Sequence, residues 1–134
     1  MQNTQKERII AYLRDTYGTE PEYLWAAYPD YMVFRQPVSQ KWYALIAGVP
    51  GNKLGLAEKK RLDILDLKCS PVMAGSLLSE KGFLPAYHMN KKTWITILLD
   101  GSVPDEEIKL LLAMSYDSVT PKMRKKKVEY KEEF

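Results

Sequence analysis

The alternating stretch TWITILLDG, residues 93–101, is the feature of the sequence that most constrains the fold. Successive side chains of a strand point to opposite faces of a sheet, so Ile95 and Ile97 share one face while Trp94 lies on the other. The run ends at an Asp-Gly pair, where glycine permits the chain to leave the strand. We therefore expect a strand over about 93–99 whose isoleucine face packs on the core.

Three segments have the periodicity and the capping residues of helices. Thr4 and Glu7 form a capping box in front of an apolar run with helical spacing. Ser70 suits the N-cap of a second helix, and Gly82 suits its end. The expected helices cover about 4–17, 70–82 and 104–117.

Three earlier segments favour strands. Residues 31–36 and 41–49 are rich in aromatic and branched side chains, and a short turn-like break separates them, so we expect a hairpin. Residues 61–69 begin in alternation and shift phase at Leu65, which indicates a bulge. Residues around Pro85 are expected to form a loop. The predicted class is α+β, an antiparallel sheet with helices packed mainly on one face.

The positive charge of the chain is concentrated at its C-terminal end. The net charge is +3, but residues 1–118 hold equal numbers of basic and acidic residues. We therefore predict one domain over 1–118 and a basic tail over 119–134. The isoelectric point near 8.9 describes this tail, so it gives only weak support for nucleic-acid binding by the fold.

Composition and spacing exclude several classes of protein and site. No run approaches the roughly 18 apolar residues of a membrane span, and the N-terminus lacks the apolar core of a signal peptide. One cysteine and one histidine cannot assemble a usual zinc site or an internal disulfide. No glycine-rich nucleotide loop and no nucleophile–base pair is visible. We expect a cytoplasmic protein with no cofactor, no metal and no catalytic residues.

Five segments, in this order, closely resemble the MmcQ/YjbR family of small bacterial proteins. They are YPDYMVFRQ, KWYALI, LDLKCSP, GFLPAYHMNKKTWITILLDGSVPDEEI and SYD, and they span about residues 20–118. The most specific part is a His-x-Asn-Lys-x-x-Trp arrangement followed by Leu-Asp-Gly. The residues of this motif are His88, Asn90, Lys91, Trp94, Leu99, Asp100 and Gly101.

The resemblance implies a compact α/β fold with an antiparallel sheet. The family is commonly labelled DNA-binding, because its sheet looks like the "double wing" of a phage transcription factor. That label is an analogy between folds, and one fold hosts many functions. The resemblance therefore constrains the fold more than the activity.

The motif residues have several possible roles. His88 is interpreted as a side chain that holds the loop, as a phosphate or ligand contact, or, least favoured, as an acid or base, because no partner carboxylate is near in sequence. Lys91 and Lys92 are expected at the start of the strand, on opposite faces. Asp100 and Gly101 are expected to form the turn into the last helix. None of these residues makes a metal set.

Tryptophans provide a second kind of candidate surface. Trp94 is expected opposite the core face, together with Trp42 from a neighbouring strand. An exposed aromatic surface could stack bases, could receive a protein partner, or could be covered by other parts of the chain. Cys69 is expected to be a packed small side chain, since nothing nearby supports a nucleophile.

Two hypotheses of function follow. The first is a non-enzymatic protein that binds DNA weakly. In this hypothesis lysine and arginine side chains contact the phosphates of the DNA backbone. These side chains are Lys59, Lys60, Arg61, Lys91, Lys92, Lys122, Arg124, Lys125, Lys126 and Lys127. The alternative is a protein- or ligand-interaction module that uses the aromatic sheet face and has no role with nucleic acid.

Overall fold

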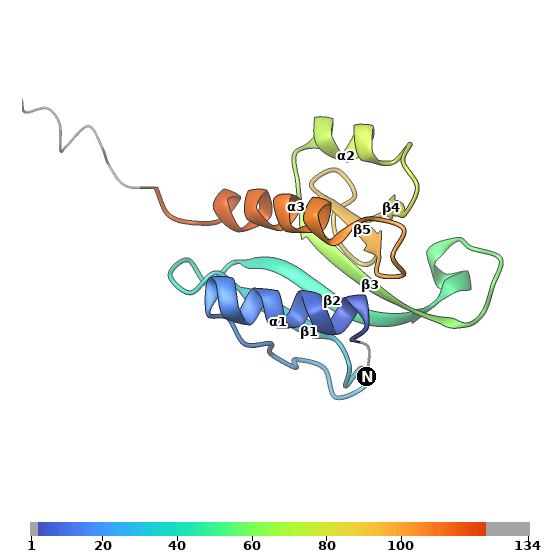
Figure 1. Ribbon diagram of the computed structural model, residues 1–134, viewed down its shortest axis with the longest axis horizontal. Helices are drawn as coiled ribbons and strands as arrows, with labels where there is room; N and C mark the ends of the chain where they lie inside the picture. The colour runs from blue at the N-terminus through green and yellow to red at the C-terminus, as the bar shows by residue number, and fades with distance from the viewer. Residues whose placement is uncertain (1–2, 123–134) are drawn as a thin grey trace, which may run out of the picture.

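The computed structural model describes residues 3–122, in which one sheet of five strands carries three α-helices on one face (Figure 1). All neighbouring strands are antiparallel, and their order in the sheet is β1-β2-β3-β5-β4. In chain order the elements are α1 (Gln5–Tyr17), β1 (Met32–Arg35), β2 (Trp42–Pro50), the 3₁₀ helix η1 (Gly51–Leu54), β3 (Arg61–Lys68), α2 (Pro71–Leu77), β4 (Phe83–Pro85), β5 (Trp94–Leu98) and α3 (Asp105–Ser118). The predicted α+β class, with helices on one face, is confirmed.

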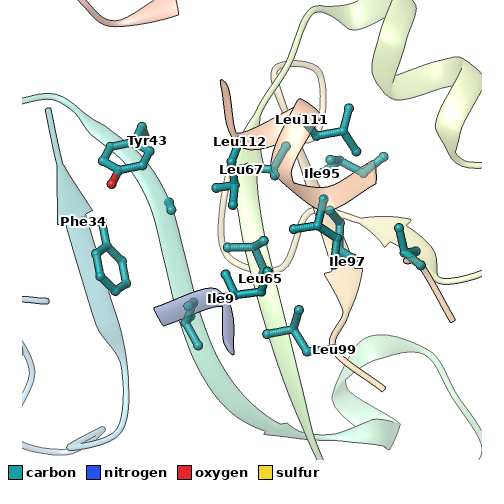
Figure 2. Close-up of a cluster of buried hydrophobic side chains, with 14 of the residues drawn as sticks. Ile9, Phe34, Tyr43, Leu65, Leu67, Ile95, Ile97, Leu99, Leu111 and Leu112 are labelled. Atoms are coloured by element: carbon teal, nitrogen blue, oxygen red, sulfur yellow. The ribbon is translucent and has the colours of Figure 1, made fainter. Parts of the chain in front are cut away.

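The helix face of the sheet, which the three α-helices cover, carries the larger hydrophobic core. Ile9 of α1 and Leu112 of α3 are fully buried in the same cluster as Leu65 of β3 (Figure 2). The buried Ser115 hydroxyl of α3 donates a hydrogen bond to the Tyr43 carbonyl of β2 at 2.6 Å. Apolar burial and this bond together hold α3 against the sheet.

The opposite face, called the loop face below, is covered by segments without regular structure. Val33, Leu45 and Ile64 form a second buried cluster there, and partly buried Trp25 and Tyr87 pack on it. Trp25 belongs to the connection between α1 and β1, and Tyr87 belongs to the loop between β4 and β5. Of the three alternatives for the sheet face opposite the core, cover by other parts of the chain therefore applies to much of this face.

The capping residues predicted both ends of the first helix, but only the beginning of the second. The Thr4–Glu7 capping box is present, with both of its hydrogen bonds at 3.1 Å. Ser70 caps α2, but α2 ends at Leu77, well before Gly82. Two tight turns follow α2, and Gly82 has a φ of +92° in the turn into β4. The helix expected over 70–82 is thus too long, because the glycine belongs to the next turn.

Two predictions about the strands are wrong. β3 has an uninterrupted register with both of its neighbours, and the irregular pairing of the sheet lies between Phe34 and Arg35 of β1. The apparent phase shift arises because Ile64 and Leu65 are buried on opposite faces of a strand that is covered on both sides. The short strand β4 occupies the segment around Pro85 that was expected to be a loop.

The two edges of the sheet are short or covered. Glu22 and Val33 exchange two backbone hydrogen bonds of 2.9 Å, so the α1–β1 connection lies along the outer side of β1. At the other edge β4 has three residues and ends in Pro85. Few backbone groups of either outer strand are left for further pairing.

Candidate functional site

A concave cleft on the loop face is lined mainly by aromatic side chains. It has a volume of about 310 Å³. Its walls come from the α1–β1 connection, from β2 and from the loop between β4 and β5. We call it the aromatic cleft, and its lining residues are Trp25, Tyr28, Tyr31, Trp42, Leu45, His88 and Met89.

The outer wall of the aromatic cleft is built by two successive turns. The Tyr28 N–H donates to the Trp25 carbonyl, and the Tyr31 N–H donates to the Tyr28 carbonyl, each at 3.1 Å. These turns place three rings along one short segment. Pro21 precedes these turns and Pro29 lies within the second, and both restrict the backbone. The prolines and aromatics of this connection therefore form an ordered wall.

The rings in the wall contact one another in defined geometries. Trp25 meets Trp42 edge-to-face, with ring centroids 5.9 Å apart at 87°. Tyr28 stacks on Tyr31 at 4.8 Å and 26°. Burial, with Tyr87 as a further cause, raises the pKa of Tyr31 above its usual value, so this side chain is a neutral phenol. Such contacts hold the rings in place before any ligand arrives.

The opposite wall is the loop that carries His88. His88 has a φ of +61°, a backbone conformation that few residues other than glycine adopt, and its ring centroid lies 4.0 Å from that of Tyr87. The side chain is exposed and makes no hydrogen bond with any residue of 3–122. Its ring nitrogens therefore do not hold the loop, and the ring is available to a ligand.

The hydrogen bonds that hold this loop come from other residues. The Tyr87 N–H donates to the Thr96 hydroxyl at 2.9 Å, and the Thr96 hydroxyl donates to the buried Asp66 carboxylate. The Lys91 ammonium donates to the Ala86 carbonyl at 2.7 Å. Thr96 thus connects the cleft wall to the centre of the sheet.

Asp66 is an ionisable side chain with no solvent exposure. Its Oδ2 has no hydrogen-bond partner among the described residues. Burial raises the pKa of Asp66 to about 7, although the Thr96 hydroxyl and the nearby Lys91 charge act in the opposite direction. Protonation of this carboxyl therefore changes between mildly acidic and mildly basic solution.

A second cleft, which we call the polar cleft, adjoins the aromatic cleft. It has a volume of about 720 Å³ and shares Tyr28, Tyr31 and His88 with the first. Arg61, Lys53, Asp30, Tyr87 and Gly48 also line it. The two clefts share part of their walls, and together we call them the depression, with an apolar end at the aromatic cleft and a charged end at the polar cleft.

An ion pair lies across the polar cleft. Arg61 Nη2 donates to Asp30 Oδ2 at 2.5 Å. A Cβ atom at Gly48 would lie 2.8 Å from Arg61 Nε and 2.8 Å from Asp30 Oδ2, so the absence of a side chain lets the pair lie on β2. This pair is the only hydrogen bond of the Arg61 guanidinium with residues 3–122.

The predicted basic residues are only partly brought together. Arg61 faces the polar cleft, whereas Lys59, Lys60 and Lys92 are exposed outside both clefts. Lys91 precedes β5 and lies next to the loop that it holds. Of the tail candidates, Lys122 is exposed, and Arg124, Lys125, Lys126 and Lys127 lie outside the described residues.

The other motif residues serve the two ends of β5. Asn90 accepts a hydrogen bond from the Lys92 N–H at 2.8 Å. Burial raises the pKa of Asp100, but hydrogen bonds from Ser102 outweigh it and hold that pKa below its usual value. Gly101 has a φ of +90° in the expected turn. These residues shape the entry and the exit of the strand.

The expected aromatic surface of Trp94 with Trp42 from a neighbouring strand does not form, because β3 separates β5 from β2 in the sheet. Trp94 is 8% exposed and does not line the aromatic cleft, while Trp42 contacts Trp25. The sequence placed Trp25 and Tyr28 in the connection before the strand expected over 31–36, and Tyr31 at the start of that strand, whereas β1 begins at Met32. The density of aromatic residues in YLWAAYPDY was the available signal for this wall.

Other candidate chemistry lies away from the clefts. Cys69 is half-buried at the end of β3, and burial raises the pKa of its thiol. Within residues 3–122, no three histidine, cysteine or carboxylate side chains gather where they could hold a metal ion. In the same part of the chain, no helix has the length and apolar character needed to cross a membrane.

Known proteins with similar sequences or folds share most of this chain. A family model described as YjbR matches residues 14–118. The uncharacterized protein YyaQ of Bacillus subtilis (strain 168) is 40% identical over 111 residues, which are 83% of this chain and 94% of YyaQ. A crystal structure of a Pseudomonas syringae protein has a TM-score of 0.84 and 41% identity, and covers 89% of this chain and 100% of the other. A Deinococcus radiodurans crystal structure has a TM-score of 0.60 and 28% identity, and covers 82% of this chain and 77% of the other.

Proposed function

We propose that this chain, which belongs to the YjbR family, is a non-enzymatic binding protein whose aromatic cleft receives a flat aromatic group of a ligand. The aromatic cleft is the observation that carries this proposal. Ligand pockets are concave, mostly apolar and about 300–1,000 Å³ in volume. A cleft of about 310 Å³ is at the lower end of this range and has room for one ring system.

The arrangement of the rings supports binding by stacking. Trp42 and Tyr31 each meet Trp25 edge-to-face, so these rings are held in place without a ligand. Tyr28 is 51% exposed and His88 is exposed as well, so two ordered rings at the rim have surface left for contact with an incoming group. Stacking of a base on a protein aromatic ring contributes about 1–3 kcal/mol.

The surroundings of His88 favour binding over catalysis. A general base needs hydrogen-bond reach to its substrate and usually a partner that orients its ring. The ring of His88 packs against Tyr87 and has no hydrogen-bonded carboxylate, hydroxyl or thiol among residues 3–122. A contact to a bound ligand is the role that this exposed ring fits.

Uncharged aromatic probes test the proposal. Adenosine and indole, added to the full chain, are expected to cause saturable NMR shifts at Trp25, Trp42 and the loop of His88. Trp25→Leu should weaken binding at least tenfold, which corresponds to about 1.4 kcal/mol. His88→Ala, at an exposed position, should weaken binding without a change in melting temperature.

Trp94→Phe is the matched control, because Trp94 is a tryptophan on the loop face that does not line the cleft. This variant should keep the affinity of the parent chain for both probes. The proposal is wrong if neither probe causes saturable shifts, or if the shifts cluster on the helices and not around the cleft.

A second candidate function is weak binding of duplex DNA through phosphates. It is supported by the exposed side chains of Lys59 and Lys92, which make no ion pair with residues 3–122, and by the basic tail. The geometry weakens one part of it, since Lys91 is engaged with the Ala86 carbonyl. Phosphate contacts of this kind make binding fall steeply with salt.

A salt titration tests this second candidate. We expect duplex DNA to bind at about 50 mM salt and to dissociate as salt is raised, because bound counterions are released from the DNA. Replacing Lys59, Lys92 and the tail lysines by glutamine should abolish the binding. Absence of binding at low salt, or binding that survives these replacements, would exclude phosphate-directed DNA binding.

A further inference from the structure

The charged end of the depression lies directly beside the aromatic cleft. Tyr28, Tyr31 and His88 belong to the walls of both clefts, so the two clefts lie side by side and are within reach of one elongated molecule. The polar cleft, at about 720 Å³, is the larger of the two. A ligand that filled only the aromatic cleft would leave the larger part of the depression to water.

The charged residues of the polar cleft carry a positive excess. Arg61 and Lys53 line it against the single carboxylate of Asp30. Lys53 is exposed and makes no ion pair with any residue of 3–122. A group that enters this end of the depression therefore meets one more positive charge than negative, which favours an anion.

Asp30 leaves most of the Arg61 guanidinium available. A guanidinium has five N–H donors, and Asp30 accepts a hydrogen bond from Nη2 alone. The ion pair holds the planar group on β2 above Gly48, where a larger residue would displace it. Asp30 is thus a positioning residue, and the remaining donors suit an anion with several oxygen atoms, because such oxygens accept paired hydrogen bonds from arginine.

We infer that the ligand of the aromatic cleft is a nucleoside phosphate, with its base in the aromatic cleft and its phosphate in the polar cleft beside Lys53 and Arg61. This inference rests on the proposed function and adds the chemical class of the ligand to it. The base matches the stacking rings, the sugar spans the shared wall of Tyr28 and His88, and the phosphate matches the cationic end. A free nucleotide and the end of a single strand share this chemistry.

Titration with a matched set of probes tests the inference on the full chain at low salt. Adenosine 5′-monophosphate should bind at least tenfold more tightly than adenosine, and inorganic phosphate should bind more weakly than the nucleotide. Arg61→Gln and Lys53→Gln should each reduce the advantage of the nucleotide over adenosine and leave adenosine binding unchanged. Lys60→Gln, next to Arg61 but outside both clefts, should have no effect.

Each outcome separates the two levels of the proposal. Equal affinities for adenosine and its monophosphate, unaffected by Arg61→Gln, would overturn the phosphate assignment and leave the aromatic cleft as a binding site. No binding of any aromatic probe would overturn the proposed function and the inference together. A single-stranded oligonucleotide with a 5′-phosphate distinguishes the two sources of the nucleoside phosphate. Tighter binding than the mononucleotide indicates the end of a strand, and equal or weaker binding indicates a free nucleotide. Both results support a nucleoside phosphate as the ligand.

Discussion

Replacing Asp66 by asparagine is expected to stabilise the protein at pH 8 and to change its stability little near pH 4. Asp66 is fully buried, and burial raises its pKa from the usual 3.8 to about 7. A shift of one pKa unit corresponds to about 1.4 kcal/mol, so a shift of this size costs at most about 4 kcal/mol of folding free energy at high pH. Asparagine keeps the shape and the acceptor for Thr96 but carries no charge.

The direction of the pH dependence follows from the sign of the shift. Below about pH 4 the Asp66 carboxyl is protonated in the folded and the unfolded chain, so it does not oppose folding. Between about 4 and 7 the unfolded chain releases this proton while the folded chain retains it, and the free energy of unfolding falls as the pH rises. Above the folded pKa the loss is complete and stays constant.

Urea unfolding at several pH values measures this effect. The difference in unfolding free energy between Asp66→Asn and the parent chain should grow from about pH 4 to pH 7 and then level off. Asp63→Asn is the matched control, because Asp63 lies in the same strand but its side chain is 37% exposed beside Lys6. A constant difference across the whole range would contradict the role given to the burial of Asp66.

Replacing Thr96 by valine is expected to destabilise the fold by about 2–6 kcal/mol, since it leaves one buried and one part-buried polar group without a partner at about 1–3 kcal/mol each. Valine keeps the branched shape of threonine and its preference for strands. The two groups that lose their partner are the Asp66 carboxyl and the Tyr87 N–H. The loss should be larger at pH 8 than at pH 5, because the Thr96 hydroxyl favours the ionised form of Asp66.

The same substitution is expected to weaken binding in the aromatic cleft. Tyr87 lies next to His88, so release of its N–H frees the wall of the cleft that His88 forms. Thermal unfolding and the adenosine titration together measure both effects. Thr93→Val is the control, since Thr93 enters the same strand and its hydroxyl makes no hydrogen bond within residues 3–122. Similar losses in the two variants would show that the Thr96 hydroxyl has no special role.

Local signals predicted the elements whose causes are local. The capping box of Thr4 and Glu7 marks α1, because both hydrogen bonds form within one turn. The alternation around Ile95 and Ile97 marks β5 and its core face, because these two apolar side chains pack in the larger core while polar Thr96 lies between them in the sequence. These elements could be predicted from neighbouring residues alone.

Elements with non-local causes were missed or misplaced. β3 is covered on both faces, so apolar residues occur at both parities, and Leu65 looked like a change of phase. β4 has only three residues and contains Pro85, so it exists through its pairing with β5 and not through its own pattern. Gly82 was assigned to the end of the preceding helix. Its positive φ in fact belongs to the turn into β4, a strand that the sequence pattern did not reveal.

The candidate site depends on contacts that no spacing reveals. Its walls come from residues near Trp25, Trp42 and His88, three segments that meet only in the folded chain. Asp66 gave a detectable signal, since it has the parity of Ile64 in an apolar strand and therefore faces a buried layer. The lysine clusters were conspicuous in the sequence, but charge runs on the surface carry little information about which residues converge.

The edges of the sheet limit how a macromolecule can approach this protein. Glu22 occupies the outer side of β1 at Val33, and β4 offers three residues that end in a proline. A partner therefore finds little backbone with which to extend the sheet as an added strand, and fibre-like stacking of copies edge to edge is disfavoured. Recognition then depends on side chains, so the specificity of this protein can change by substitution around the depression while the strand register remains intact.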